Sequence, residues 1–171
     1  MIKKLLFWEK PAEYVSKYSL AESIKRLKEN LGSEWNPFHL GISGKVSEKR
    51  VRIYRSIPLY GNSFIPIFTG LFERSNDKVI LYGKYSMHAG TKIFTSIWLS
   101  FVILLAIPIY FSAIRALLLG HKKINNFDPL VLIPLGMLVS GILLVKFGQW
   151  LSRNDIAYIS ERITNILNNK S

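Results

Sequence analysis

The pattern of hydrophobic and polar positions contains two long apolar runs joined by a short polar loop. The first, Ile93–Ile114, has no charged residue, and the second, Pro129–Gln149, has only Lys146, near its end. At about 1.5 Å per residue, the first run forms a helix of roughly 33 Å, enough to cross a hydrocarbon core of about 30 Å. The pattern therefore predicts a two-helix transmembrane hairpin over residues 93–150. A pair of buried helices in a soluble protein is the alternative.

Small residues predict how these two helices pack. Ser96 and Ser100 are four positions apart on the first helix, and Gly136 and Ser140 are four apart on the second. Small side chains at this spacing allow two backbones to approach closely. We expect the helices to pack through these positions.

Between His39 and His88 the period changes to two, as in a β-strand with one buried face. Around Val51 and Ile53, for example, apolar residues alternate with polar ones. The alternation and the intervening turns predict four strands, at His39–Val46, Arg50–Tyr54, Phe64–Arg74 and Lys78–Met87. Because the turns between them are short, we expect an antiparallel meander.

Two further segments have helical periodicity. Ser19 and Glu22 form a capping box ahead of an apolar stripe, and Gly32 follows it at a position suited to ending a helix. After Trp150, Ser152 or Asn154 can cap a second amphipathic helix. The two stripes comprise Leu20, Ile24, Leu27 and Leu31, then Ile156, Ile159, Ile163, Ile166 and Leu167. Both helices are expected to pack on the sheet, although the first is also compatible with a helix lying on a membrane surface.

Together these patterns predict an α+β membrane protein. Its four-stranded antiparallel sheet with flanking amphipathic helices is interrupted by the two-helix transmembrane hairpin. The expected divisions are an N-terminal helix and sheet at 1–92, the hairpin at 93–150, and a C-terminal amphipathic helix on the sheet at 151–171.

The charge pattern bears on location and partners. The chain has 23 basic and 11 acidic residues, a net charge of +12. More basic residues flank the outer ends of the hairpin than occur in its loop, which carries Arg115, Lys122 and Lys123. The positive-inside rule therefore predicts a two-span membrane protein with both termini in the cytoplasm. A basic domain beside a membrane is suited to the lipid bilayer and its anionic headgroups, or to another membrane protein. No nucleic-acid-binding motif is identifiable.

The sequence gives no indication of catalysis. It has no cysteine, and His39, His88 and His121 are scattered. Neither a Ser-His-acid set nor a glycine-rich phosphate loop is identifiable. We therefore predict no enzyme activity, no catalytic residues, no metal site and no cofactor.

Two sets of residues are candidates for contacting a lipid or ligand. Asn62 and Ser63, in the segment Tyr60–Pro66, can supply polar contacts, or they can bond their own turn. Four basic residues can share one sheet face if the second and fourth strands are near neighbours, and there bind phosphate headgroups. They are Arg50, Arg52, Arg55 and Lys84. An ordinary solvated polar face is the alternative.

A further set of short motifs is spread over about residues 38–167. The Asn-Ser-Phe-x-Pro element at 62–66 is the most specific of them. The others are Gly44–Val46, Arg52–Tyr54, Gly70, Gly83, Met87–His88, Pro134–Met137 and Gly148–Leu151. In these motifs the chain resembles a family of small uncharacterised bacterial membrane proteins. The resemblance implies an architecture and a place in the bacterial inner membrane, and no activity.

Three classes of function remain. The first is a membrane-anchored cytoplasmic binding or interaction module that contacts lipid headgroups, an amphiphile or another membrane protein. The second is an accessory subunit of a larger membrane complex, and the third, an enzyme, has no supporting constellation. An apolar cavity between sheet and helices would favour the first class. A filled core with an exposed apolar hairpin would favour the second.

Overall fold

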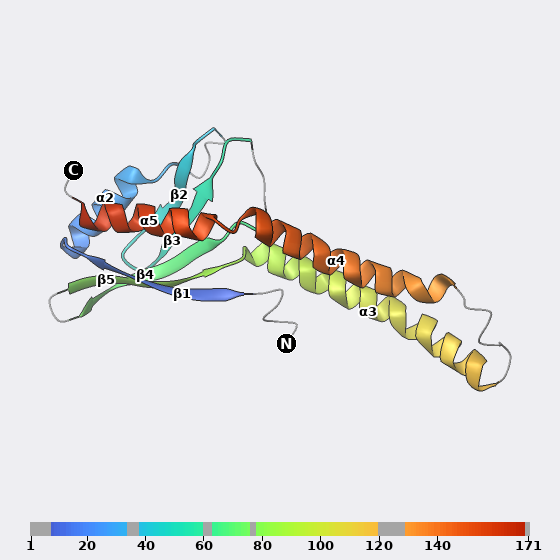
Figure 1. Ribbon diagram of the computed structural model, residues 1–171. Coiled ribbons are helices and arrows are strands. Elements are labelled where there is room, and N and C mark those ends of the chain that lie inside the picture. The colour runs from blue at the N-terminus through green and yellow to red at the C-terminus, as the bar shows by residue number, and fades with distance from the viewer. Residues whose placement is uncertain (1–7, 34–37, 60–62, 76–77, 120–128, 170–171) are drawn as a thin grey trace. The chain divides into compact units, whose positions relative to one another are not determined.

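The computed structural model describes residues 8–33, 38–59, 63–75, 78–119 and 129–169 (Figure 1). The chain divides into two compact units, one made of Met1–His88 with Gly148–Ser171 and the other of Ala89–Phe147. The first unit combines a sheet with two helices, and the second contains most of the apolar hairpin. The two units are considered separately.

The first unit contains a five-stranded antiparallel sheet with the strand order β1-β5-β4-β3-β2. Its strands are β1 (Glu9–Ser16), β2 (Gly41–Val46), β3 (Val51–Ser56), β4 (Ile67–Ser75) and β5 (Lys78–Ser86). The predicted antiparallel sheet and α+β class are confirmed, and β2 to β5 correspond to the four predicted strands. The predicted number of strands is wrong, because β1 was not recognised.

The edge position of β1 explains why its pattern is weak. The strand pairs only with β5, and of its residues only Tyr14 and Ser16 are buried. Pro11 has no amide hydrogen to donate, so it suits an edge strand, and charged neighbours such as Glu9 and Lys10 discourage further strand pairing. These same features break the alternation by which a strand is recognised in a sequence.

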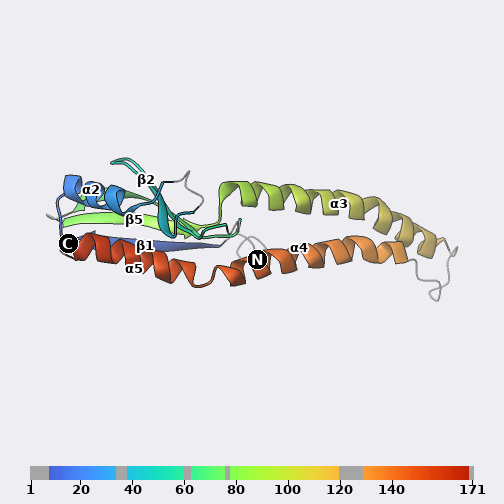
Figure 2. The same cartoon turned by 90° about the horizontal axis from the view of Figure 1, so that it is seen from above.

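Two helices, α2 (Leu20–Asn30) and α5 (Asp155–Asn168), pack on one face of the sheet. They contact each other, and Figure 2 shows α5 running alongside β1. The fully buried side chains of this core are Leu27, Val51, Ile53, Phe68, Leu81, Ile159, Ile163 and Leu167. The core between sheet and helices is therefore filled by side chains that the apolar patterns had marked.

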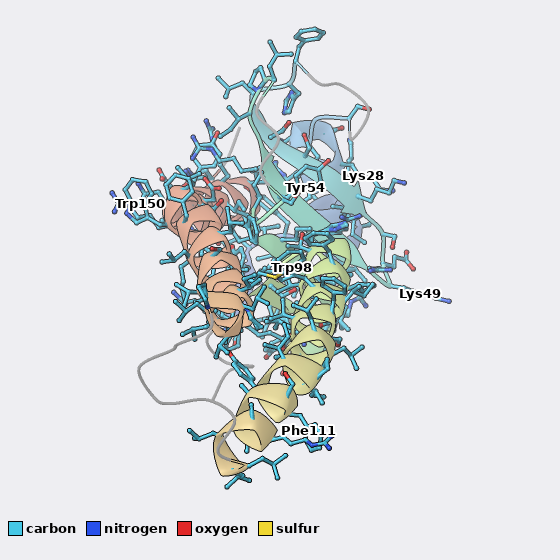
Figure 3. All side chains as sticks on the ribbon, turned by 90° about the vertical axis from the view of Figure 1, so that its right-hand side faces the viewer. Lys28, Lys49, Tyr54, Trp98, Phe111 and Trp150 are labelled. Carbon is cyan, nitrogen blue, oxygen red and sulfur yellow. The ribbon has the colours of Figure 1, made fainter. Side chains whose placement is uncertain are left out.

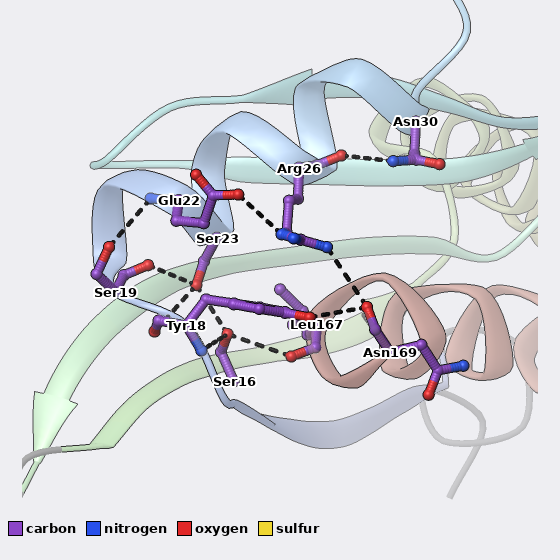
Figure 4. A network of polar contacts seen from close by, with 9 residues as sticks. All are labelled: Ser16, Tyr18, Ser19, Glu22, Ser23, Arg26, Asn30, Leu167 and Asn169. Atoms are coloured by element: carbon purple, nitrogen blue, oxygen red, sulfur yellow. Dashed lines mark hydrogen bonds and ion pairs between the residues drawn. The ribbon is translucent and has the colours of Figure 1, made fainter. Parts of the chain in front are cut away.

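A polar network fastens β1 to both helices (Figure 4). The Ser16 hydroxyl shares a 2.8 Å hydrogen bond with that of Ser23 in α2. The backbone amide of Lys17 donates to the carbonyl of Leu167 in α5, at 3.1 Å. Ser19 caps α2 as expected, accepting from the Glu22 amide at 3.4 Å. The Glu22 carboxylate, however, bonds Arg26 at 2.9 Å.

The second unit contains α3 (Ala89–Leu118), the 3₁₀ turn η1 (Pro129–Val131) and most of α4 (Leu132–Leu151). By length and composition, two helices of the described chain are apolar enough to cross a membrane. Most of their large apolar side chains are exposed. Crossing itself stays a prediction.

The predicted packing positions of the hairpin are wrong. Ser96, Ser100, Gly136 and Ser140 are all exposed, and each serine hydroxyl bonds a carbonyl of its own helix. The side chains buried within this unit include Thr91, Thr95, Val102 and Val145. Gly141 lies against the Trp98 ring, since a Cβ added to this glycine would come within 2.9 Å of the indole nitrogen. A single glycine facing an aromatic ring thus takes the role expected of the small-residue pairs.

Candidate functional site

Strand alternation and register separate the four basic candidates into two groups. Arg52 pairs in register with Thr69, and Thr69 with Lys84, so the three lie in one cross-strand row on the same face. Arg50, two positions before Arg52, continues on that face. The core residues Val51 and Ile53 point to the helix-covered face, and Arg55 follows their parity. The four candidates therefore do not share one face as we had expected. Arg55 lies on the face opposite to the other three.

Arg55 serves the packing of the domain. Its guanidinium donates a 2.8 Å hydrogen bond to the Asp155 carboxylate at the start of α5 and lies 4.5 Å from the centroid of the Tyr158 ring. The Asp155 side chain is only 7% exposed. Burial of the carboxylate makes this ion pair a link between β3 and α5, not a contact for an outside ligand.

Lys84 lies on the open face but already has an acidic neighbour. Its ammonium group is 2.7 Å from the Glu9 carboxylate of β1. Both side chains are well exposed, so the pair contributes little to stability, about 0–1 kcal/mol. The pair nevertheless reduces the positive charge that Lys84 presents.

Arg50 and Arg52 line an open groove of about 670 Å³ at the β2 side of the sheet. Lys28 of α2 and Lys45 of β2 also line it, and none of its described lining residues is acidic. The remaining lining residues are Leu31, Gly32, Ser33, Gly44, Val46 and Ser47. We call this surface the basic groove. Figure 3 labels Lys28 of α2, Lys49 in the turn between β2 and β3, and Tyr54 of β3.

Local structure holds the arginine side of the basic groove in place. The turn between β2 and β3 is closed by the Ser47 amide donating to the Arg50 carbonyl at 2.9 Å, and the Ser47 hydroxyl accepts from the Arg50 amide at 3.1 Å. The Arg52 guanidinium lies 5.9 Å from the centroid of the Tyr54 ring, within range of a cation–π interaction. Both arginines are therefore carried by a paired strand and a closed turn.

Gly44 is required for β2 to pair with β3 at the basic groove. Its φ is +151°, and an added Cβ would lie 1.9 Å from the Arg52 carbonyl oxygen. Only glycine adopts this backbone conformation at low energy, and only glycine has no Cβ to collide with the facing strand. The close approach brings Lys45 into register beside Arg52.

Of the predicted polar pair at 62 and 63, Asn62 lies outside the described residues. Ser63 is exposed and does not line the basic groove. Next to it, the Phe64 ring packs against Gly148, where an added Cβ would come within 2.1 Å of a ring carbon. The described part of this loop thus contacts the segment that leads toward α5.

Two of the four cations in the basic groove were not singled out from the sequence. Lys45 could have been found, because the short turn at 47–50 fixes the register that pairs it with Arg52. Lys28 comes from a helix whose placement on the sheet depends on tertiary packing, so its sequence gives no such signal. Two smaller clusters of basic residues line grooves elsewhere, namely Lys17, Arg74 and Lys78, and Arg26 and Arg162. Within the described ranges no three His, Asp or Glu side chains are grouped to hold a metal ion.

No protein-family model matches this chain, and neither does any curated protein or solved structure. The resemblance to uncharacterised bacterial membrane proteins thus stays a prediction, and the site has to be interpreted from its own geometry.

Proposed function

We propose that this chain is a membrane-anchored binding module of the bacterial inner membrane, and that its basic groove contacts anionic lipid headgroups from the cytoplasmic side. The observation that carries the proposal is the convergence of Lys28, Lys45, Arg50 and Arg52 on one groove whose described lining has no acidic residue. The apolar helices α3 and α4 are long enough to anchor such a module. No catalytic step is part of this function.

The filled core limits where a partner can bind. Leu27, Ile159 and Ile163 are 0% exposed between the helices and the sheet, so an amphiphile inside the core has no support. Binding is therefore assigned to the surface. Each basic side chain near an anionic leaflet contributes on the order of 1 kcal/mol, so four can fix the orientation of an already anchored domain.

The test uses the full chain, which has no cysteine, carrying the single substitution Lys49→Cys beside the basic groove. In vesicles that expose the domain, a maleimide should label this thiol more slowly with anionic lipid than with neutral lipid. Adding Lys28→Gln, Lys45→Gln, Arg50→Gln and Arg52→Gln should abolish the difference without releasing the protein from the membrane.

A matched control removes four exposed lysines elsewhere, with Lys10→Gln, Lys17→Gln, Lys25→Gln and Lys78→Gln. This variant should keep the difference in labelling rate between anionic and neutral vesicles, because it lowers the net charge and leaves the basic groove intact. Equal labelling rates in anionic and neutral vesicles for the parent would contradict the proposal.

A second candidate is an accessory subunit of a larger membrane complex. It is favoured by the filled core together with the exposed apolar surface of the hairpin, where Ile97, Leu104 and Phe111 are 65–68% exposed. This combination is the one expected for an accessory subunit, so the first candidate rests on the basic groove alone. Mild-detergent purification followed by mass spectrometry tests this candidate. A membrane protein retained at fixed stoichiometry would support it, and a chain that purifies alone would oppose it.

A further inference from the structure

We infer that the basic groove recognises a phosphate monoester, the doubly charged group that ends some lipid headgroups. This inference rests on the proposed function and names the chemistry that the same groove selects. The ordinary alternatives in a membrane are a phosphodiester or a carboxylate headgroup, each with less charge on the terminal group.

The first argument is charge. Four cationic side chains from α2, β2, the turn and β3 line one groove, with no acidic residue among the described lining. A phosphate monoester carries roughly −1.5 to −2 at neutral pH, since its second pKa is near 6. It therefore gains more from four converging cations than a singly charged headgroup does.

The second argument is hydrogen-bonding geometry. Arg50 and Arg52 are two positions apart on one face, roughly 7 Å along the strand direction. Each guanidinium presents a planar pair of donors that matches two phosphate oxygens, whereas Lys28 and Lys45 act as point charges. A monoester offers three terminal oxygens, so two arginine forks can engage it by sharing one oxygen, whereas the two terminal oxygens of a diester are occupied by a single fork.

The third argument concerns the rest of the lining. Leu31, which is half-buried, adds apolar surface beside the cations. The groove is open, so a headgroup that remains attached to its lipid can enter. This favours a lipid over free phosphate, which would use none of the apolar surface.

The experiment raises the mole fraction of phosphatidic acid, phosphatidylglycerol or phosphatidylserine in neutral vesicles, with Lys49→Cys labelling as the readout. The charge per headgroup differs by at most about twofold among these lipids, so charge alone cannot give a tenfold difference. Phosphatidic acid should protect the thiol at a roughly tenfold lower mole fraction, the effect of about one additional charge-assisted hydrogen bond. The preference should fall below about pH 6, where the monoester gains its second proton. Arg52→Lys keeps the charge and removes the planar fork, so it should reduce the preference while general anionic protection remains.

The outcomes distinguish the monoester inference from the proposed contact with anionic headgroups on which it rests. Equal protection by the three lipids would overturn the monoester inference and leave the anionic-headgroup function standing. No protection by any of them would overturn both. A few millimolar glycerol 3-phosphate, but not chloride at equal ionic strength, should compete with phosphatidic acid for the groove. Protection of the thiol by glycerol 3-phosphate in neutral vesicles, with none by phosphatidic acid, would overturn the lipid source.

Discussion

The Arg55 guanidinium and the Asp155 carboxylate, 100 positions apart, meet at 2.8 Å between β3 and the first turn of α5. The guanidinium is also stacked over Tyr158. This pair explains why one arginine of β3 is structural while Arg52, on the opposite face of the same strand, lines the basic groove.

Arg55→Gln should lower the free energy of unfolding by about 1–3 kcal/mol, because it leaves a buried carboxylate without its charged partner. Chemical denaturation of the detergent-solubilised chain measures the loss. The double variant Arg55→Met with Asp155→Leu should recover part of it. Arg55→Gln should also retain vesicle-dependent protection of a thiol at position 49, and loss of that protection in a folded variant would place Arg55 in the binding surface.

The sequence alone could have predicted that Arg55 lies on a different face from Arg50 and Arg52. Residues two apart on a strand share a face, so Arg50 and Arg52 go together, while Arg55 has the parity of Val51 and Ile53. The same alternation of apolar and polar residues predicted the strands β2 to β5. β1 could not be found that way, because an edge strand with Pro11 buries only part of one side.

Gly44→Ala should destabilise the sheet by more than about 1 kcal/mol, since alanine disfavours φ near +151° and its Cβ would overlap the Arg52 carbonyl. Thermal unfolding followed by circular dichroism measures the effect. Gly136→Ala is the matched control, because an added Cβ there meets nothing within 4 Å and alanine favours a helix. Equal stability of the two variants would show that β2 tolerates a side chain at position 44.

The buried hydroxyl pair of Tyr14 and Tyr85 should make stability fall at alkaline pH. The two oxygens are 2.6 Å apart, and burial, followed by the hydrogen bond to Tyr14, raises the pKa of Tyr85 above its ordinary value of 10.0. A raised pKa means that the neutral form is favoured in the folded state. Its contribution is therefore fully present below about pH 10 and is lost as the pH rises further.

Replacing both hydroxyls, with Tyr14→Phe and Tyr85→Phe, should make the alkaline decline less steep without leaving either tyrosine hydroxyl without the other. Urea unfolding from pH 8 to pH 11 measures both slopes. Because lysines titrate in the same range, only the difference between parent and variant is informative. Identical slopes in the parent and the double variant would mean that burial does not raise the pKa of Tyr85.

The hairpin shows what sequence spacing could not decide. Four small residues matched a packing motif, yet their spacing does not say which side of a helix meets its partner. The observed contact between Trp98 and Gly141 depends on the rotation of both helices. Gly141→Leu should displace the Trp98 ring and lower the melting temperature in detergent, whereas Gly136→Leu should change it little. A greater loss from Gly136→Leu would restore the originally predicted packing face.

The final prediction concerns the orientation of the hairpin. Between the two apolar runs the sequence has Arg115, in the last turn of α3, and then Lys122 and Lys123, and more basic residues lie near the outer ends of the runs. Because basic flanks are retained in the cytoplasm, a reporter fused after Ser171 should be cytoplasmic and one inserted within 119–126 should be extracytoplasmic. Lys122→Gln with Lys123→Gln should sharpen this distribution, since it removes competing charge, and adding lysines to the loop should weaken it. An extracytoplasmic reporter after Ser171 would instead place the basic groove outside the cytoplasm, and the proposed contact with headgroups of the cytoplasmic leaflet would then be wrong.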